Sequence, residues 1–297
     1  MNSRTASVSD WRTWPQAELE RQYDARATVP DIATELKAYR DASTPMYELT
    51  PCWRDVAYGT GPDEALDLFP VAGQPEAPLL VFIHGGYWRA LHSQDSVFMA
   101  QQLTAHGIAV AAINYTLAPQ ATLAHIVAQC QRAVTWLLND ATSHGIAPQR
   151  TVLAGSSAGA HLAAMLLAPD WQTAQGLLPQ ALHGGVLLSG LYDLEPVQRC
   201  LPNTWLNLSV QEAKRLSPMQ HLPHPTLPLY IAVAEQDTEE FKRQSRDYAA
   251  ACSAQDNAVT WHETPQRNHF DIVRDWMDPQ SHLFQATLAL LNGTPQQ

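Results

Sequence analysis

The sequence is poor in basic residues and contains no cluster of them. Of its 297 residues, 18 are Lys or Arg and 29 are Asp or Glu, so the formal net charge at pH 7 is −11. Such a surface repels phosphate backbones and anionic lipid headgroups. We therefore expect a small-molecule partner and neither nucleic acid nor membrane.

Cysteine is scarce as well, and the four cysteines are far apart, at positions 52, 130, 200 and 252. They form neither C-x-x-C pairs nor the dense framework of a small secreted domain, so we expect free thiols and no structural zinc. No apolar run reaches the roughly 20 residues of a membrane span. The polar start from Met1 to Trp14 does not resemble a signal peptide. These absences predict a cytoplasmic protein.

Apolar residues are abundant, at 45% of the chain, and they gather in short runs that alternate with helical patterns. We expect strands at 56–58, 65–69, 79–83, 108–113, 151–154, 185–189, 228–234 and 258–262. We expect helices at 121–140, 158–168, 239–253 and 279–291. This alternation predicts an α/β protein, with a mostly parallel twisted sheet of about eight strands and helices on both faces.

The chain divides into a helical front and one larger domain. Residues 1–50 are predicted to form an N-terminal helical segment that packs over the core, and residues 51–294 a single domain. Within it, the alternation lapses into a Pro-rich stretch with two short helices, the second opened by a capping box from Ser209 to Glu212. Because ligands bind at the carboxyl ends of parallel strands, this insertion at about 191–226 is predicted to be a small lid.

Two glycine-containing motifs follow buried strands and predict acyl-transfer chemistry. The first, G-x-S-x-G, has Ser157 at its centre, and a serine there lies on a tight strand-to-helix turn with its hydroxyl exposed. The second is His-Gly-Gly after the strand 79–83. The backbone N–H groups of Gly85, Gly86 and Ala158 are predicted to form the oxyanion hole, which stabilises the negative oxygen of the intermediate.

A serine nucleophile needs a histidine base held by a carboxylate. In the G-x-S-x-G hydrolases the acid follows a later strand and the histidine comes last. Asp237 and His269 meet this order with Ser157 and are predicted to complete the triad. Glu235 and Glu240 remain alternatives for the acid, because predicted strand ends can be wrong by one or two residues.

Other aromatic and histidine residues near these motifs have weaker predicted roles. Tyr87 and Trp88 either line the pocket mouth or pack against the sheet. His84 is expected to brace the glycine loop, and His161 to be a packing residue rather than a base. His262 and His282 are weaker bases by position. The histidines are scattered without a matching carboxylate array, so we expect no metal and no cofactor.

With these residues placed, the sequence resembles the α/β-hydrolase type of kynurenine formamidase, also called arylformamidase. The similarity runs from about residue 18 to 292 and includes His84–Trp88, Ser157–Leu162, Ser189–Pro196, Ser217–Pro218, Asp237–Ser245 and Asn268–Asp271. The resemblance implies the α/β-hydrolase fold and a triad of Ser157, Asp237 and His269. It also implies hydrolysis of N-formyl-L-kynurenine to L-kynurenine and formate, a step of tryptophan catabolism.

Two departures from the family pattern affect the predicted pocket. Ser156 stands where the family usually has histidine, and Asn268 where some members have an acid. Ser156 is therefore counted among the substrate-binding residues. The sequence does not decide whether Arg89 or Arg199 meets the carboxylate of a kynurenine-like substrate. It also leaves the oligomeric state open, a homodimer being one candidate.

Two other functions compete with the formamidase interpretation. A carboxylesterase or amidase of the hormone-sensitive-lipase-like branch, acting on small aromatic esters, carbamates or amides, shares both glycine motifs. The matches at 189–196 and 237–245 favour the formamidase. A binding protein that keeps the cavity without the chemistry is disfavoured, because such proteins usually lose the nucleophile or the histidine.

Overall fold

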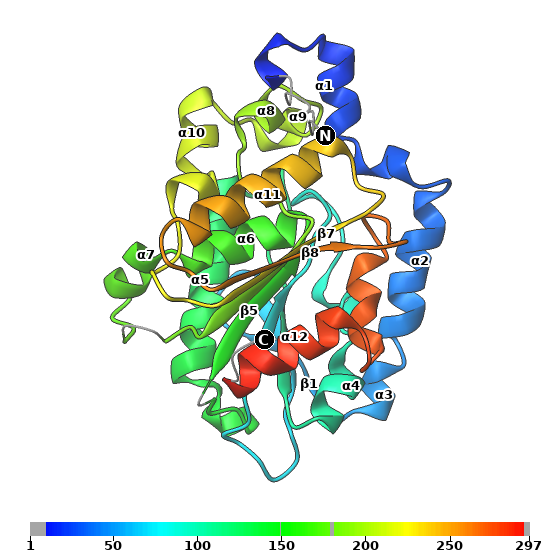
Figure 1. Ribbon diagram of the computed structural model, residues 1–297. Coiled ribbons are helices and arrows are strands. Elements are labelled where there is room, and N and C mark those ends of the chain that lie inside the picture. The colour runs from blue at the N-terminus through cyan, green and yellow to red at the C-terminus, as the bar shows by residue number, and fades with distance from the viewer. Residues whose placement is uncertain (1–9, 149, 179–180, 294–297) are drawn as a thin grey trace, which may run out of the picture.

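One twisted sheet of eight strands organises the computed structural model, which describes residues 10–148, 150–178 and 181–293 (Figure 1). The strands are β1 (Trp53–Ala57), β2 (Ala65–Phe69), β3 (Leu79–Ile83), β4 (Ala109–Ile113), β5 (Thr151–Ser156), β6 (Gly184–Leu188), β7 (Leu229–Ala234) and β8 (Val259–Thr264). Their order is β1-β2-β4-β3-β5-β6-β7-β8. The pairs β1–β2 and β2–β4 are antiparallel, and the remaining pairs are parallel.

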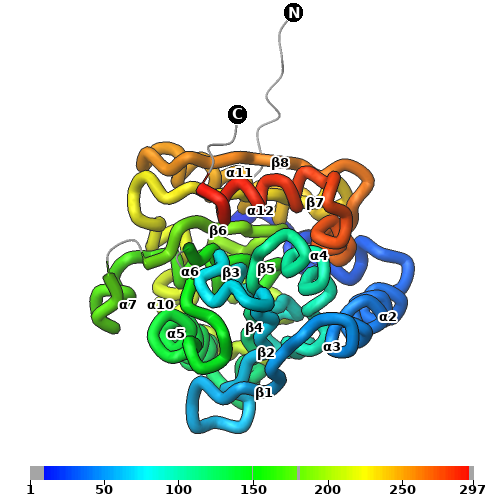
Figure 2. Tube along the Cα trace, turned by 90° about the horizontal axis from the view of Figure 1, so that it is seen from below, coloured from blue at the N-terminus to red at the C-terminus, as the bar shows by residue number. Residues whose placement is uncertain are grey.

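Helices cover both faces of this sheet. The α-helices are α1 (Gln16–Tyr23), α2 (Ile32–Ser43), α3 (Met46–Leu49), α4 (Ala100–Ala105), α5 (Leu123–Asn139), α6 (Ala158–Leu167), α7 (Pro169–Ala174), α8 (Glu195–Gln198), α9 (Asn203–Leu206), α10 (Val210–Arg215), α11 (Glu239–Ser253) and α12 (His282–Asn292). Short 3-10 helices lie at Trp11–Thr13, Ala25–Thr28, Ser93–Asp95, Ala141–His144, Pro218–Gln220 and Ile272–Met277. Figure 2 shows α5 on one side of the sheet and α2, α3 and α4 on the other.

The two hydrophobic cores follow from the alternation of side chains along each strand. In β3, Leu79, Val81 and Ile83 pack into one core with α1, α5, α6 and α11, whereas Leu80 and Phe82 pack into the other with α4 and α12. Successive side chains of a strand point to opposite faces, so a run that is apolar at every position must be covered on both sides. The continuous apolar runs in the sequence are thus a direct consequence of the three-layer arrangement.

The predicted elements agree closely with the structure. The six strands from β3 to β8 lie within two residues of the predicted bounds, α11 covers the predicted range, and the capping box joins Ser209 and Glu212. One expectation is wrong: the stretch 191–226 contains three short α-helices (α8, α9 and α10), not two. The helices α8 and α9 have four residues each, too few to leave a periodic pattern in the sequence.

Two further expectations concern cysteine and membrane spans. All four cysteines are free thiols, and three of them are buried. In the described part of the chain, no helix is both long and apolar enough to cross a bilayer.

Candidate active site

Ser157 occupies the sharp turn between β5 and α6 with backbone angles φ 56° and ψ −121°. The adjacent glycines make this turn possible. A Cβ added at Gly159 would lie 2.0 Å from the carbonyl oxygen of Ile83, and one at Gly155 would lie 2.2 Å from the carbonyl oxygen of Gly159. Because no real Cβ tolerates such distances, only glycine lets α6 start against the end of β3. The turn therefore places Ser157 at the carboxyl edge of the sheet.

The loop after β3 runs directly beside this turn. Gly86 has φ +93°, and a Cβ there would lie 2.3 Å from the carbonyl oxygen of Ala90. A Cβ on Gly85 would lie 2.8 Å from the carbonyl oxygen of Ser156. Of the two predicted oxyanion glycines, Gly85 thus lies against the turn that carries Ser157, and Gly86 lies against Ala90 in its own loop. Ala158 is the first residue of α6, and the N–H groups of a helix's first turn have no partner within the helix.

His84 contacts the glycine loop and holds it in place. Its ring stacks on Tyr115 with centroids 4.3 Å apart, and its Nδ1 lies 2.9 Å from the carbonyl oxygen of Gly85. The Tyr115 hydroxyl donates to the carbonyl oxygen of His84 at 3.0 Å. These contacts fix the loop that carries the two glycines.

Asp237 and His269 form a buried pair. Nδ1 of His269 donates to Oδ1 of Asp237 at 2.6 Å, and the carboxylate is fully buried. The other carboxylate oxygen accepts hydrogen bonds from the Ser189 hydroxyl at 2.5 Å and from the Ala234 N–H at 3.1 Å. Because Nδ1 is engaged, Nε2 is the ring nitrogen left for proton exchange. Sequence analysis missed Ser189, although its position at the end of β6 was a usable signal.

The two alternative acids lie elsewhere. Glu235 is exposed, and its carboxylate accepts a hydrogen bond from the Gln266 N–H at 2.7 Å. Glu240 is buried, but its carboxylate is bound by Arg243 and by the Tyr23 hydroxyl. Among the described acidic residues, Asp237 is the one paired with His269.

His161 is a packing residue in this structure. It is fully buried, its Nε2 donates to the carbonyl oxygen of Leu216 at 2.7 Å, and its ring meets Trp88 edge-on at 5.0 Å. Burial lowers the pKa of His161 to about 4, and the pKa of His84 is lowered to about 4 by the same cause. Both imidazoles are therefore neutral near pH 7.

This buried histidine makes stability depend on pH. Since the pKa of an unfolded histidine is about 6.5, the unfolded chain binds more protons between about pH 6.5 and pH 4, and the free energy of unfolding falls as the pH falls. His161→Gln keeps a donor for Leu216 but cannot titrate. Between about pH 6.5 and 4.5, the wild type should lose about 2 kcal/mol more than this variant. Urea unfolding at both pH values measures the difference, and equal losses would contradict the assignment.

A cavity of about 600 Å³ lies above the carboxyl edge of the sheet. Ser157, His269, Gly85 and Gly86 line its floor, so the predicted nucleophile, base and two oxyanion residues share one space. Its other lining residues include members of the N-terminal segment and of the stretch 191–226: Ala17, Glu20, Arg21, Tyr23, Asp24, Ile32, Leu36, Tyr39, Leu201, Pro202 and Trp205.

The three predicted substrate-binding residues differ in their positions. Tyr87 and Ser156 line the cavity. Trp88 lies outside the lining and is fully buried against His161. The backbone φ is positive at both Tyr87 (50°) and Trp88 (57°), so the alternation of a regular strand does not apply to them.

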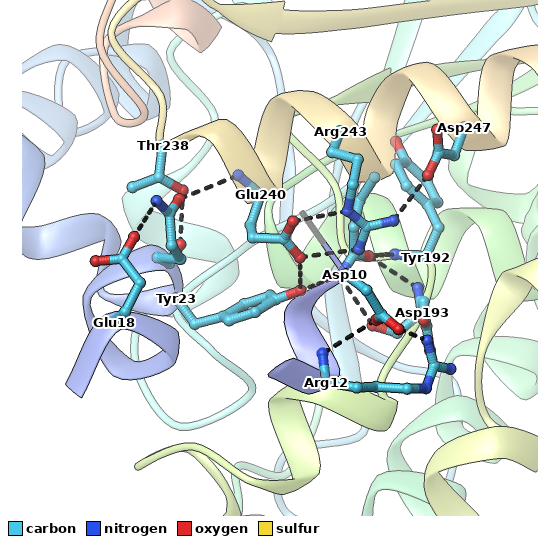
Figure 3. Close-up of polar contacts among 12 residues, drawn as sticks. Asp10, Arg12, Glu18, Tyr23, Tyr192, Asp193, Thr238, Glu240, Arg243 and Asp247 are labelled. Carbon is cyan, nitrogen blue, oxygen red and sulfur yellow. Dashed lines mark hydrogen bonds and ion pairs between the residues drawn. The ribbon is translucent and has the colours of Figure 1, made fainter. Parts of the chain in front are cut away.

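A largely buried polar network joins α1, whose Tyr23 lines this cavity, to α11 (Figure 3). The Tyr23 hydroxyl donates to the Glu240 carboxylate at 2.7 Å. Two nitrogens of Arg243 donate to the same carboxylate at 2.7 and 2.8 Å. The Thr238 hydroxyl donates to the carbonyl oxygen of Gln22 at 2.6 Å. Because Thr238 directly follows Asp237, the network ties α1 to the loop that carries the predicted acid.

Metal ligation has no candidate in the described ranges: no group of three or more His, Cys, Asp or Glu side chains is arranged to hold an ion. At the floor of the cavity, Ser157, His269, Gly85 and Gly86 supply a hydroxyl, an imidazole and backbone amides. This set suits attack on a carbonyl carbon without further groups.

Comparisons with known proteins identify hydrolases among the relatives of this chain. A family model described as BD-FAE matches residues 66–173. The chain is 34% identical to kynurenine formamidase of Salmo salar and 31% identical to that of Danio rerio, each time over 96% of this chain and 99% of the relative. A solved esterase of Pyrobaculum calidifontis superposes with a TM-score of 0.70 over 94% of this chain and 97% of that one. At 16% identity, the last likeness concerns the fold alone.

Proposed function

The chain belongs to the kynurenine formamidase family of α/β-hydrolases, and we propose that it cleaves aryl formamides through a Ser-His-Asp triad, with N-formyl-L-kynurenine as its substrate and L-kynurenine and formate as its products. One observation carries the proposal. Ser157, on its strained turn, and His269, whose Nδ1 lies 2.6 Å from Oδ1 of Asp237, border the same cavity. This combination supports acyl transfer to a serine.

In the proposed reaction, the Ser157 hydroxyl attacks the formyl carbon while Nε2 of His269 takes its proton. The tetrahedral intermediate then collapses: the C–N bond breaks, and His269 delivers the proton to the leaving arylamine nitrogen. Water, deprotonated by His269, then attacks the formyl carbon of the formyl-enzyme. The bond between that carbon and Oγ of Ser157 breaks, His269 returns the proton to Oγ, and formate is released. Asp237 holds the tautomer with hydrogen on Nδ1 and stabilises the imidazolium.

The negative oxygen of each intermediate is proposed to accept hydrogen bonds from the N–H groups of Gly85, Gly86 and Ala158. Preorganised donors of this kind stabilise charge that develops in the transition state, and losing one typically costs about 10²-fold or more in rate. The N-terminus of α6 adds the positive end of the helix dipole at the same point.

The cavity also suits an aromatic leaving group. Tyr39, Phe82 and Phe270 line the cavity and give it aromatic walls. The formyl group is the smallest acyl group, so it needs little space beside Ser157. Tyr87, Ser156 and Trp88 are proposed to shape the substrate site, the first two from the lining and Trp88 through its packing beneath the loop.

We further propose that the N-terminal segment (1–50) and the lid (191–226) form the roof of the cavity and set substrate size. Their lining residues support this, as does the Tyr23–Glu240 contact that holds the segment down. Residues 1–9 lie outside the described part. The proposed partner is a small aromatic amide or ester, and the proposed compartment is the cytoplasm, in keeping with four unpaired thiols.

A substrate comparison tests this function. We expect kcat/KM for N-formyl-L-kynurenine to exceed that for N-acetyl-L-kynurenine and that for phenyl acetate by at least about tenfold, because the larger acyl group must fit beside Ser157. Equal values for the two kynurenines, with phenyl acetate preferred, would favour the alternative. That alternative is a carboxylesterase or amidase that acts on small aromatic esters, carbamates or amides. The fold that this chain shares with the Pyrobaculum esterase is compatible with it.

A further inference from the structure

We propose that Arg89 binds a carboxylate on the substrate, so that the cavity selects aryl formamides with an anionic group far from the formyl end. The inference rests on the proposed function for its choice of substrate. It comes from one juxtaposition: an exposed arginine, stacked on an aromatic side chain, lines the same cavity as Ser157.

Arg89 differs from the other arginines that line the cavity in having no acidic partner among the residues that the structure describes. Arg21 donates to both carboxylate oxygens of Glu18, at 2.9 and 2.6 Å. Arg26 pairs with Asp24 at 3.2 Å. Within the described ranges, Arg89 forms no ion pair, and its guanidinium lies over Trp205, whose ring centroid is 4.6 Å from the guanidinium carbon. Its positive charge is thus available to a ligand.

The stacking partner is itself held in place. Trp205, in α9, donates from Nε1 to the carbonyl oxygen of Tyr87 at 3.1 Å, and the rings of Trp205 and Tyr87 meet at 6.4 Å. A guanidinium held over an aromatic face keeps N–H groups directed outward in its own plane, where they match the two oxygens of a carboxylate. The platform therefore orients Arg89 before any ligand arrives.

The backbone links this cation to the proposed oxyanion hole. The N–H groups of Arg89 and Ala90 both donate to the carbonyl oxygen of Gly86 at 3.0 Å, so Arg89 sits on a tight turn that starts at one of the two oxyanion glycines. Arg89 is exposed, whereas Ser157 is buried at the cavity floor. In N-formyl-L-kynurenine the carboxylate and the formamide are at opposite ends, which matches a site with the reactive group below and the cation at the rim.

Arg199, the other candidate from the sequence, lies outside the cavity lining. Its guanidinium carbon is 5.6 Å from the ring centroid of Trp11. Both arginines are exposed and both lie over a tryptophan, so Arg199 offers a matched control for Arg89.

The experiment compares Arg89→Met and Arg199→Met on two formamides. The substrates are N-formyl-L-kynurenine and 2-formamidoacetophenone, which keeps the ring, ketone and formamide but has no carboxylate. Since a hydrogen bond to a charged group contributes about 1.5–3 kcal/mol, Arg89→Met should raise KM for N-formyl-L-kynurenine by about 10- to 100-fold and change kcat by less than about threefold. In Arg89→Met, KM and kcat for 2-formamidoacetophenone should not change. Arg199→Met should have wild-type KM and kcat for both substrates.

Three results would overturn the inference. They are an unchanged KM for N-formyl-L-kynurenine in Arg89→Met, an equal loss on both formamides, and the same loss in Arg199→Met. Arg89→Lys, which keeps the charge but not the planar fork, should fall between wild type and Arg89→Met.

A separate pair of substrates keeps this test independent of the formamidase proposal. If the wild type cleaves esters and ignores formamides, 4-acetoxybenzoate and phenyl acetate replace the two formamides. Arg89→Met should then lower kcat/KM for 4-acetoxybenzoate alone. If Arg89→Met leaves the ratio of the kcat/KM values for the two esters unchanged, the proposed role of Arg89 is overturned, whatever acyl group the enzyme prefers.

Discussion

Ser157→Ala is expected to lower kcat by about 10⁶-fold, because it removes the hydroxyl that is proposed to form the acyl-enzyme. The substitution removes one oxygen atom and keeps the backbone at φ 56°, so the turn and the fold should survive. A stopped assay for formate or arylamine release measures the loss, and a thermal melt within a few degrees of wild type checks the fold.

Covalent labelling makes the Ser157 test sharper. An aryl organophosphonate should add its mass once to the wild type, at the peptide that contains Ser157, and should leave Ser157→Ala unlabelled. A variant that retains more than about 1% of wild-type turnover, or that is labelled at the same rate, would remove Ser157 from its proposed role.

Asp237→Asn should lower kcat by about 10⁴-fold with little effect on stability. The asparagine amide could donate to Nδ1 of His269, which would put the ring hydrogen on Nε2 and remove the lone pair that must accept the serine proton. The neutral amide would also stop stabilising the imidazolium. The measurement is a full rate profile with pH, in which the variant should recover part of its activity at high pH, where deprotonated serine no longer needs the base.

Glu235→Gln is the matched control for the acid. Glu235 lies two residues from Asp237 but is exposed and contacts the Gln266 N–H rather than His269. This variant should keep kcat within about threefold of wild type, since surface substitutions away from special contacts have small effects. A larger loss in Glu235→Gln than in Asp237→Asn would reverse the assignment of the acid.

The positions of the strands and the nucleophile turn could be predicted because local rules govern them. A strand buried on both faces must be apolar at each position, which is visible in β3 without knowledge of its neighbours. The glycines at 155 and 159 are likewise required by a close backbone approach. Both signals are contained in a few consecutive residues.

The acidic partner of His269, in contrast, could not be chosen from local sequence. Asp237, Glu235 and Glu240 lie within six positions, and each was plausible as the partner of His269. The structure separates them by contacts with residues that are far away in the chain: Ser189 and His269 for Asp237, Gln266 for Glu235, Tyr23 for Glu240. The Tyr23–Glu240 contact joins residues 217 positions apart, and no local pattern encodes it.

The sequence by itself determined the strands, their α/β alternation and the elbow at Ser157, since side-chain periodicity and glycine spacing are properties of short segments. Tertiary structure alone decided that Tyr87 faces the cavity while Trp88 is buried, that Ser189 supports Asp237, and that Arg89 and not Arg199 reaches the cavity. These outcomes depend on which distant segments pack together and on side-chain directions at positive φ, and neither follows from the order of neighbouring residues.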